Sequence, residues 1–164
     1  LENAMEQART AQVKWATVKP AARSQILKQL IPVLLSEGDR LAKLISDENG
    51  KTRLDAMATE ILAATLATRY YCRKAPAFLK TTGPGKGSLA TFNKKSHILR
   101  VPYGVVGIIS PWNYPFSIPF SEVLMALLAG NAVILKPSEY TPYSGLLAED
   151  PEGTDLRGAA GLDE

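Results

Sequence analysis

The sequence predicts an α/β fold in which N-terminal helices precede a β-hairpin and one β-α-β unit. Three observations support this prediction. Apolar side chains recur at helical spacing over residues 3–74, polar residues separate two short runs between residues 88 and 104, and two apolar runs further on flank a helical stretch. With 164 residues, 46% of them hydrophobic, the chain can form one core or part of a larger one.

The first half of the chain is expected to form four helices. They span residues 3–18, 21–36, 39–48 and 53–74. In the second helix, apolar residues from Ile26 to Leu35 recur at i, i+3 and i+4 and mark one buried stripe. Gly38 and Gly50 separate the following helices, and Pro76 is expected to end the fourth.

A β-hairpin is expected after the helices. The runs SLATF (88–92) and HILRVPYG (97–104) have the length and composition of strands, and the polar FNKKS segment between them has the composition of a turn. We therefore expect two exposed, antiparallel strands here.

A β-α-β unit follows the hairpin. The runs GVVGII (104–109) and AVILK (132–136) are continuously apolar, which is typical of strands covered on both faces. Between them, SEVLMALLAG (121–130) contains strong helix formers and ends in Gly130, a favourable C-terminal cap. This order predicts parallel strands joined by a right-handed crossover.

The loop SPWNYPFSIP (110–119) contains three prolines around Asn113, whose side chain is expected to be buried. Prolines restrict the backbone, so this segment is expected to be a rigid loop. It follows one predicted strand, and KPSEYTP (136–142) follows the other, so both loops should face one ligand site at the carboxyl edge of the sheet. Asn113 could either face that site or simply cap the next helix or close an Asx turn.

The charge balance favours neither a nucleic acid nor a membrane as partner. The net charge is +3; six acidic residues and one arginine lie in residues 148–164, which leaves +8 for residues 1–147. A solvated excess of charge explains this better than an anionic partner, although phosphate-bearing cofactors remain compatible. The sequence has no apolar run of membrane-spanning length and no secretory signal, so a soluble cytoplasmic chain is expected.

Several motifs that suggest other sites fail on inspection. SDENGKTR resembles a phosphate loop, but Ile45 stands where the first glycine is required and the segment follows a helix. GPGKG (83–87) lacks the order of a dinucleotide fingerprint and is interpreted as a loop. With only Cys72 and His97, no metal-ligand cluster or disulfide is expected, and Cys72 is interpreted as a structural thiol on a helix.

Four motifs together resemble the aldehyde dehydrogenase superfamily: ENGKT, VPYGVVGIISPWN, PWNYP and LLAGNAVILKPSEYTP. The resemblance covers residues 4–147 and is most specific over 101–143. It implies a Rossmann-like NAD-binding domain, here its N-terminal part, with the β-α-β unit in that domain. It also places residues 88–101 in a projecting hairpin that serves oligomerisation in the family, and it explains the missing dinucleotide fingerprint.

The resemblance assigns Asn113 to the oxyanion that forms when a cysteine thiolate attacks an aldehyde. A neutral amide donor stabilises such a charge, and loss of one donor costs about 10²- to 10³-fold in rate. By the same resemblance, Ser110, Pro111 and Trp112 belong to the cofactor site, the last two on its nicotinamide side.

Lys136 and Glu139 are assigned by the resemblance to the hydroxyls of the adenosine ribose. A carboxylate accepts hydrogen bonds from two hydroxyls and repels a 2′-phosphate, so NAD is favoured over NADP. NADP stays possible, because Lys136 and Ser138 could hold a phosphate if Glu139 moved aside.

The family's nucleophilic cysteine and its glutamate base lie downstream of these motifs, so the sequence is expected to be an N-terminal part of such an enzyme, inactive alone. Residues 1–147 would form part of the NAD-binding domain, and residues 148–164 a divergent acidic tail left by a frameshift, a deletion or a truncation. The full-length relative would act on a small aldehyde as a homo-oligomer. A non-catalytic nucleotide-binding or oligomerisation module and an unstable gene product are the alternatives.

Overall fold

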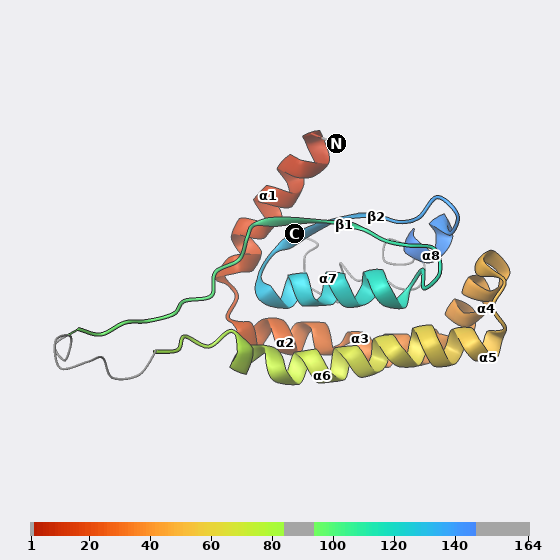
Figure 1. The fold of residues 1–164 in the computed structure, drawn as a ribbon, viewed down its shortest axis with the longest axis horizontal. Helices are drawn as coiled ribbons and strands as arrows, with labels where there is room; N and C mark the ends of the chain where they lie inside the picture. The colour runs from red at the N-terminus through yellow and green to blue at the C-terminus, as the bar shows by residue number, and fades with distance from the viewer. Residues whose placement is uncertain (1, 84–93, 147–164) are drawn as a thin grey trace.

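The computed structural model describes residues 2–83 and 94–146 and confirms an α/β fold. Its helical elements are α1 (Glu2–Thr17), α2 (Pro20–Lys28), α3 (Leu30–Ser36), α4 (Gly38–Asn49), α5 (Arg53–Ala56), the π-helical turn η1 (Met57–Ile61), α6 (Leu62–Phe78), α7 (Ser117–Ala129) and α8 (Pro142–Leu146). Its strands are β1 (Val105–Ile109) and β2 (Ala132–Lys136). Helices α2, α3 and α6 form one layer, and α7 lies between this layer and the sheet (Figure 1).

The core lies between α7 and the helices that surround it. Its fully buried large side chains include Leu34, Leu41, Ile45 and Leu124. On the other side of α7, the buried indole of Trp15 in α1 donates a hydrogen bond to a carbonyl near the end of α7. Helix α7 is therefore fixed by the helical layer along its length and by α1 near its C-terminal end, and its N-terminal end lies at the sheet edge where ligands are expected.

The single helix expected over residues 21–36 is divided at Gln29 into α2 and α3. Pro32 is the third residue of α3. It has no N–H to donate to the carbonyl of Lys28, four residues earlier, and its ring crowds that carbonyl. The helical stripe predicted from the sequence is kept, but the helix is interrupted one turn before the proline.

The expectation that Pro76 ends the fourth helix is wrong. The helical stretch that begins at α5 continues through η1 and α6 to Phe78. Ala75 stays buried, and its carbonyl accepts a hydrogen bond from the N–H of Leu79 at 2.9 Å. Packing on this face therefore outweighs the one hydrogen bond that the proline removes.

The predicted β-α-β unit is confirmed. Strands β1 and β2 pair in parallel over all five residues of each, with α7 as the crossover. Helix α7 begins at Ser117, four residues before the expected start, and Pro119 lies in its first turn, where a missing N–H is tolerated. Gly130 follows α7 with φ of 93°, the left-handed conformation expected of the C-terminal cap.

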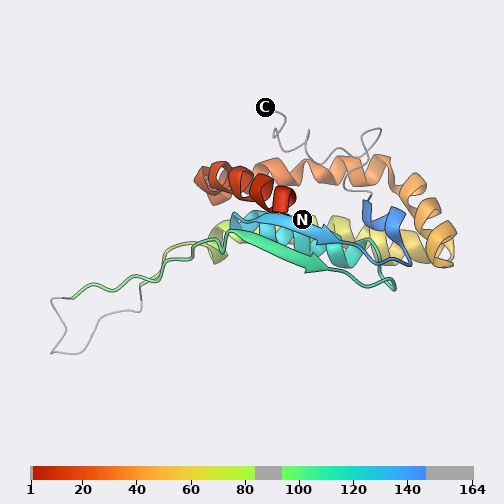
Figure 2. The ribbon, with the colours of Figure 1, turned by 90° about the horizontal axis from the view of Figure 1, so that it is seen from above.

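The prediction that both faces of the two strands are covered is wrong for the part of the chain that the structure describes. In β1 only Ile108 is buried, and Ile109 is 79% exposed; the first four residues of β2 are half-buried. Figure 2 looks onto the sheet from the side opposite α7, with α1 running beside β2. The described residues thus supply packing mainly on the α7 face.

Two extended segments, residues 79–83 and 94–104, lie side by side and project from the helical body (Figures 1 and 2). They pair at one antiparallel bridge. The N–H of Ile98 donates to the carbonyl of Thr82 at 2.7 Å, and the N–H of Thr82 donates in return at 3.2 Å. We refer to these two segments as the arm.

The strand expected over residues 97–104 is formed only at that bridge, and the strand expected over 88–92 lies outside the described residues. Leu99, Val101 and Tyr103 on the arm are all strongly exposed. A strand gains stability from neighbours that cover one face, and the described chain provides none for these side chains.

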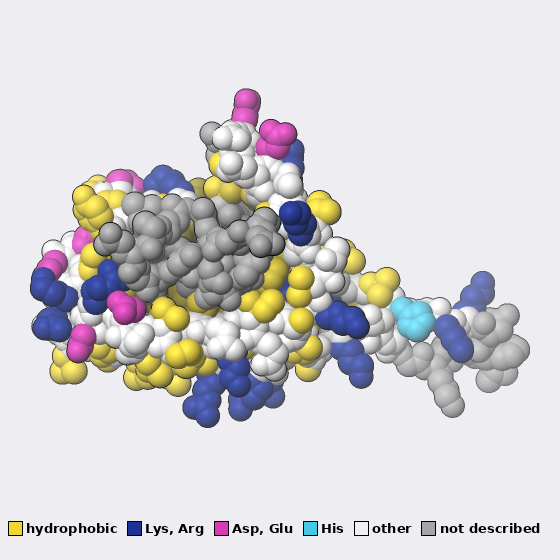
Figure 3. Space-filling view, turned by 180° about the vertical axis from the view of Figure 1, so that it is seen from behind, with side chains coloured by type: hydrophobic (Ala, Val, Ile, Leu, Met, Phe, Trp, Pro, Cys, Tyr) yellow, Lys and Arg dark blue, Asp and Glu magenta, His cyan; other side chains and the backbone are white. Residues whose placement is uncertain are grey.

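No helix within residues 2–83 and 94–146 is long and apolar enough to cross a membrane. Lys and Arg side chains are spread over several parts of the surface in Figure 3, including the arm. This distribution is consistent with the solvated charge excess inferred from the sequence.

Candidate functional site

The two loops predicted to share a site leave the same edge of the sheet. The last residues of β1 and β2, Ile109 and Lys136, are register partners, and the N–H of Ser110 donates to the carbonyl of Lys136 at 3.1 Å. The loop after β1 (110–116) and the loop after β2 (137–141) therefore begin side by side. We call this region the carboxyl edge.

In the first loop, Pro111, Trp112 and Asn113 are exposed, and Ser110 is buried. The expectation of a buried Asn113 side chain is therefore wrong. Its carboxamide has no hydrogen-bond partner in the described part of the chain. The hydroxyl of Ser110 is buried and also lacks a described partner. Both groups have hydrogen-bonding capacity left for a ligand.

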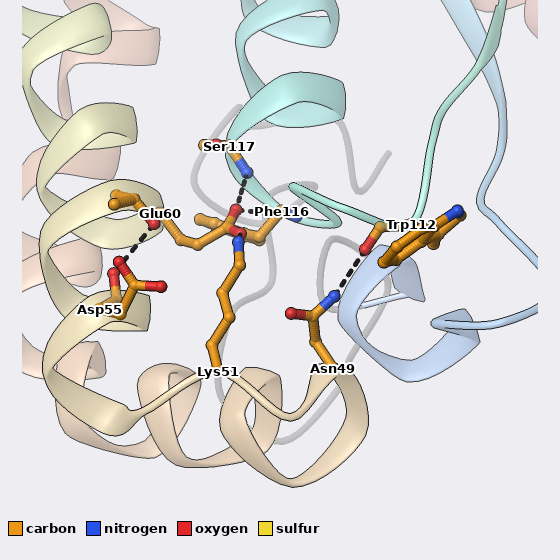
Figure 4. A network of polar contacts seen from close by, with 8 residues as sticks. Asn49, Lys51, Asp55, Glu60, Trp112, Phe116 and Ser117 are labelled. Atoms are coloured by element: carbon orange, nitrogen blue, oxygen red, sulfur yellow. Dashed lines mark hydrogen bonds and ion pairs between the residues drawn. The ribbon is translucent and has the colours of Figure 1, made fainter.

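The amides at the start of α7 are satisfied by Glu60, which lies on η1. One carboxylate oxygen, Oε2, accepts hydrogen bonds from the N–H of Phe116 at 3.2 Å and of Ser117 at 2.7 Å (Figure 4). Helix α7 has no side-chain cap, and the Asn113 carboxamide makes no hydrogen bond within the described residues, so Asn113 neither caps α7 nor closes an Asx turn there.

Glu60 is completely buried, and its second oxygen, Oε1, forms an ion pair with Lys51. The Lys51 ammonium also lies 4.0 Å from the centre of the Tyr114 ring, in the first loop. A buried carboxylate requires such compensation, because desolvation of an unpaired charge is costly. The ion pair therefore links the turn after α4 to η1 and to the loop.

A further contact supports the first loop from the turn between α4 and α5. The side-chain N–H of Asn49 donates to the carbonyl of Trp112 at 2.7 Å (Figure 4). Gly50 adopts φ of 81° and lets the chain turn, and the hydroxyl of Thr52 caps α5 by accepting from the N–H of Asp55 at 3.1 Å. The motif rejected as a phosphate loop is thus a helix-to-helix turn.

The end of α4 also contacts α8, the helix that directly follows the second loop, through Glu48. Its carboxylate accepts hydrogen bonds from the N–H groups of Tyr143 at 2.8 Å and Ser144 at 2.7 Å, at the start of α8. Both loops of the carboxyl edge are consequently supported by residues 48–52.

In the second loop, Lys136 and Glu139 are exposed and form an ion pair with an N–O distance of 3.2 Å. A hydrogen bond from the Glu139 backbone amide, and secondly the Lys136 side chain, lower the pKa of the Glu139 carboxyl below its ordinary value. Ser138 is buried, and its hydroxyl accepts from the N–H of Tyr140 at 3.3 Å. Glu139 therefore presents a charged carboxylate at the end of β2.

Comparison with known proteins agrees with this arrangement. A model of the aldehyde dehydrogenase family matches residues 1–150. This chain belongs to the aldehyde dehydrogenase family. The match covers the residues of the sequence resemblance and extends it slightly at both ends.

Individual aldehyde dehydrogenase relatives are matched over part of their length. The 4,4'-diapolycopene aldehyde oxidase of Methylomonas sp is 39% identical over 150 residues, which are 92% of this chain and 28% of the relative. A Mycolicibacterium smegmatis protein that is named a succinate-semialdehyde dehydrogenase using NADP(+) is 39% identical over 144 residues. These residues are 87% of this chain and 27% of the length of that relative. The crystal structure of an NAD-dependent benzaldehyde dehydrogenase from Corynebacterium glutamicum matches with a TM-score of 0.78 and 30% identity, over 97% of this chain and 32% of that one. The chain thus spans about three tenths of the length of these relatives.

Cys72 does not have the environment of a reactive thiol. This free thiol is buried on α6, as its interpretation as a structural residue predicted. Desolvation raises its pKa to about 11, and the charge of Lys28 opposes this only in part. The thiolate needed for nucleophilic attack is therefore disfavoured at neutral pH.

The motif ENGKT contributes to the family resemblance, but the sequence predicted no role for its residues Glu48, Asn49 and Lys51. Glu60 was not predicted at all. The available signal for Glu60 was an acidic residue directly before the apolar run ILAATL. A charge at that position of a buried helix face requires a partner, although the sequence does not say which one.

Proposed function

We propose that this chain forms part of an NAD-dependent aldehyde dehydrogenase in which Asn113 stabilises the oxyanion of the reacting aldehyde. The observation that supports this most directly is that the Asn113 carboxamide is exposed and unbonded at the carboxyl edge, while the backbone on both sides of it is hydrogen-bonded. An amide kept for a structural purpose would use its own hydrogen bonds.

The chemistry explains why an uncharged donor suits this position. A cysteine thiolate adds to the carbonyl carbon of the aldehyde, and the carbonyl oxygen becomes an alkoxide. The N–H of Asn113 donates to that oxygen and lowers the energy of the tetrahedral species without neutralising it. Loss of a hydride then gives a thioester, which water hydrolyses to the carboxylic acid. NAD, when bound, supplies the hydride acceptor.

Lys136 and Glu139 fit the adenosine ribose of the cofactor. The Glu139 carboxylate is exposed, and its lowered pKa keeps it charged, so it can accept hydrogen bonds from ribose hydroxyls. The same charge disfavours the 2′-phosphate of NADP, and we therefore propose NAD as the cofactor. Pro111, Trp112 and the unpartnered hydroxyl of Ser110 are available at the nicotinamide end.

The 164 residues contain no suitable nucleophile, because the only cysteine is Cys72. We therefore propose that this chain by itself does not oxidise aldehydes, and that residues 1–147 act as part of an NAD-binding domain. A second candidate, a non-catalytic oligomerisation module, is favoured by the exposed apolar side chains Leu99, Val101 and Tyr103 on the arm.

A chimera tests the leading proposal. Residues 1–147 would replace the matched segment of the NAD-dependent benzaldehyde dehydrogenase from Corynebacterium glutamicum, and the rate of benzaldehyde-dependent NADH formation would be measured. We expect an active chimera in which Asn113→Ala lowers kcat about 10²- to 10³-fold. An unchanged hydride-transfer rate in that variant would contradict the assignment.

The unfused chain distinguishes the candidates. We expect calorimetry to show weak or no NAD binding and assays to show no turnover. Tight NAD binding without turnover, or a stable oligomer in sedimentation that the arm variant Tyr103→Ser disrupts, would favour the module. Turnover of an aldehyde by the unfused chain would refute the enzyme proposal in its present form.

A further inference from the structure

We propose that Asn49 and Glu60 are positioning residues that aim the carboxamide of Asn113 by holding the loop backbone on both sides of it. This inference rests on the proposed role of Asn113 as the oxyanion donor. Figure 4 shows the side chains of Asn49 and Lys51 extending from the α4–α5 turn toward the loop, and the Glu60 carboxylate beside the first amides of α7.

The upstream support is the hydrogen bond from Asn49. Its side-chain N–H donates to the carbonyl of Trp112 at 2.7 Å. That carbonyl belongs to the peptide group whose nitrogen is the backbone nitrogen of Asn113, so the bond fixes the peptide plane directly before the Asn113 Cα. Any rotation of this plane would move the side chain that follows.

The downstream support is the carboxylate of Glu60. It accepts two hydrogen bonds, from the N–H groups of Phe116 and Ser117, and these are charge-assisted. The ion pair with Lys51 holds the carboxylate in place. The two supports approach from different elements, the α4–α5 turn and η1.

Little freedom remains between the supports. Pro115 is buried and has a fixed φ, and the ring of Tyr114 lies against the Lys51 ammonium. Asn113 is therefore the one exposed side chain of this short span without a described contact. Misplacement of a reacting group by about 1 Å can cost about 10²-fold in rate, so supports of this kind affect catalysis without touching the substrate.

A spectroscopic experiment on the 164-residue chain tests the two contacts. Asn49→Asp keeps the shape of the side chain and removes the donor to the Trp112 carbonyl. We therefore expect the signal of the Asn113 backbone N–H, which belongs to the same peptide group, to shift in nitrogen–proton correlation spectra. Glu60→Gln should shift the amides of Phe116 and Ser117. The matched control Asp47→Asn, on the exposed side of α4, should leave all three signals in place. An Asn113 amide that does not move in Asn49→Asp would overturn the upstream support.

Kinetics of the chimera test the positioning role. If the 164-residue chain gives no dispersed spectrum, these kinetics alone decide whether the proposal holds. We expect Asn49→Asp to lower kcat about 10-fold or more, with a smaller change in the KM for NAD. In the Asn113→Ala background the same substitution should lower kcat no further, because its effect passes through Asn113.

Equal losses in both backgrounds would mean that Asn49 acts through general stability, and the positioning role would be wrong while the role of Asn113 stood. If Asn113→Ala itself left kcat unchanged, the proposed function would fail, and the positioning proposal with it. Added osmolyte strengthens the folded state, so a kcat of Asn49→Asp that osmolyte does not restore would support the positioning role. Restoration of kcat by osmolyte would mean a loss of stability and would overturn that role.

Discussion

The buried ion pair between Lys51 and Glu60 leads to a quantitative prediction for Lys51→Met. The Glu60 carboxylate has no exposed surface, and the Lys51 side chain is 13% exposed. Removal of one partner from a buried pair typically costs about 3–5 kcal/mol, because the remaining charge stays buried. The residual exposure of Lys51 and the two amides that still bind Glu60 place the expected loss near the lower end, about 3 kcal/mol.

Urea unfolding followed by circular dichroism measures this loss. At a slope of about 1–3 kcal/mol per molar urea, the midpoint should fall by about 1–3 M. The double variant Lys51→Met/Glu60→Gln should be more stable than Lys51→Met alone, since no charge is then left buried. A loss below about 1 kcal/mol in Lys51→Met, the value of an exposed pair, would refute this account.

Three further predictions concern single residues. Cys72, whose pKa is raised to about 11 by burial, should react slowly with a thiol reagent at neutral pH and rapidly in urea; equal rates would contradict its burial. In a carbon NMR titration, Glu139 should show a pKa below its ordinary value, which Lys136→Met raises only in part, because the backbone amide is the larger cause. The associated stabilisation is present above the ordinary pKa and is lost as the pH falls through the lowered one. Gly130→Ala should destabilise the chain by about 1–2 kcal/mol or more in urea unfolding, because φ is 93° and the new Cβ would lie 2.7 Å from Nη1 of Arg23; an unchanged midpoint would contradict this.

The β-α-β unit could be predicted from the sequence because its signals are local. Two apolar runs of strand length flank a stretch of helix formers that ends in Gly130, and each signal lies within the element that it predicts. The interruption at Gln29 was also encoded locally, by Pro32, but the helical stripe concealed it. Pro76 shows the opposite case, in which packing of α6 overrides a local signal to stop.

The candidate site was predictable in position and not in its supports. Parallel strands with a crossover helix place Asn113 and Glu139 at one edge, and topology alone requires this. The contact between Glu60 and Phe116 joins residues 56 positions apart, and no periodic pattern reports it. The same separation explains why Asn113 was expected to be buried: the prolines around it suggested a packed side chain, whereas Glu60 satisfies the amides that Asn113 could have bound.

The supports of the two loops have a common origin in the C-terminal end of α4. Glu48 holds the first amides of α8, after the loop of β2, and Asn49 holds the Trp112 carbonyl in the loop of β1. These side chains are adjacent in sequence, so a displacement of this turn would move both supports together. Under the proposed function, the loop after β1 carries the oxyanion donor, Asn113, and the loop after β2 carries Glu139, whose carboxylate would bind the ribose hydroxyls of the cofactor. The turn at residues 48–52 would therefore set the spacing between the reacting end and the adenosine end of the cofactor site.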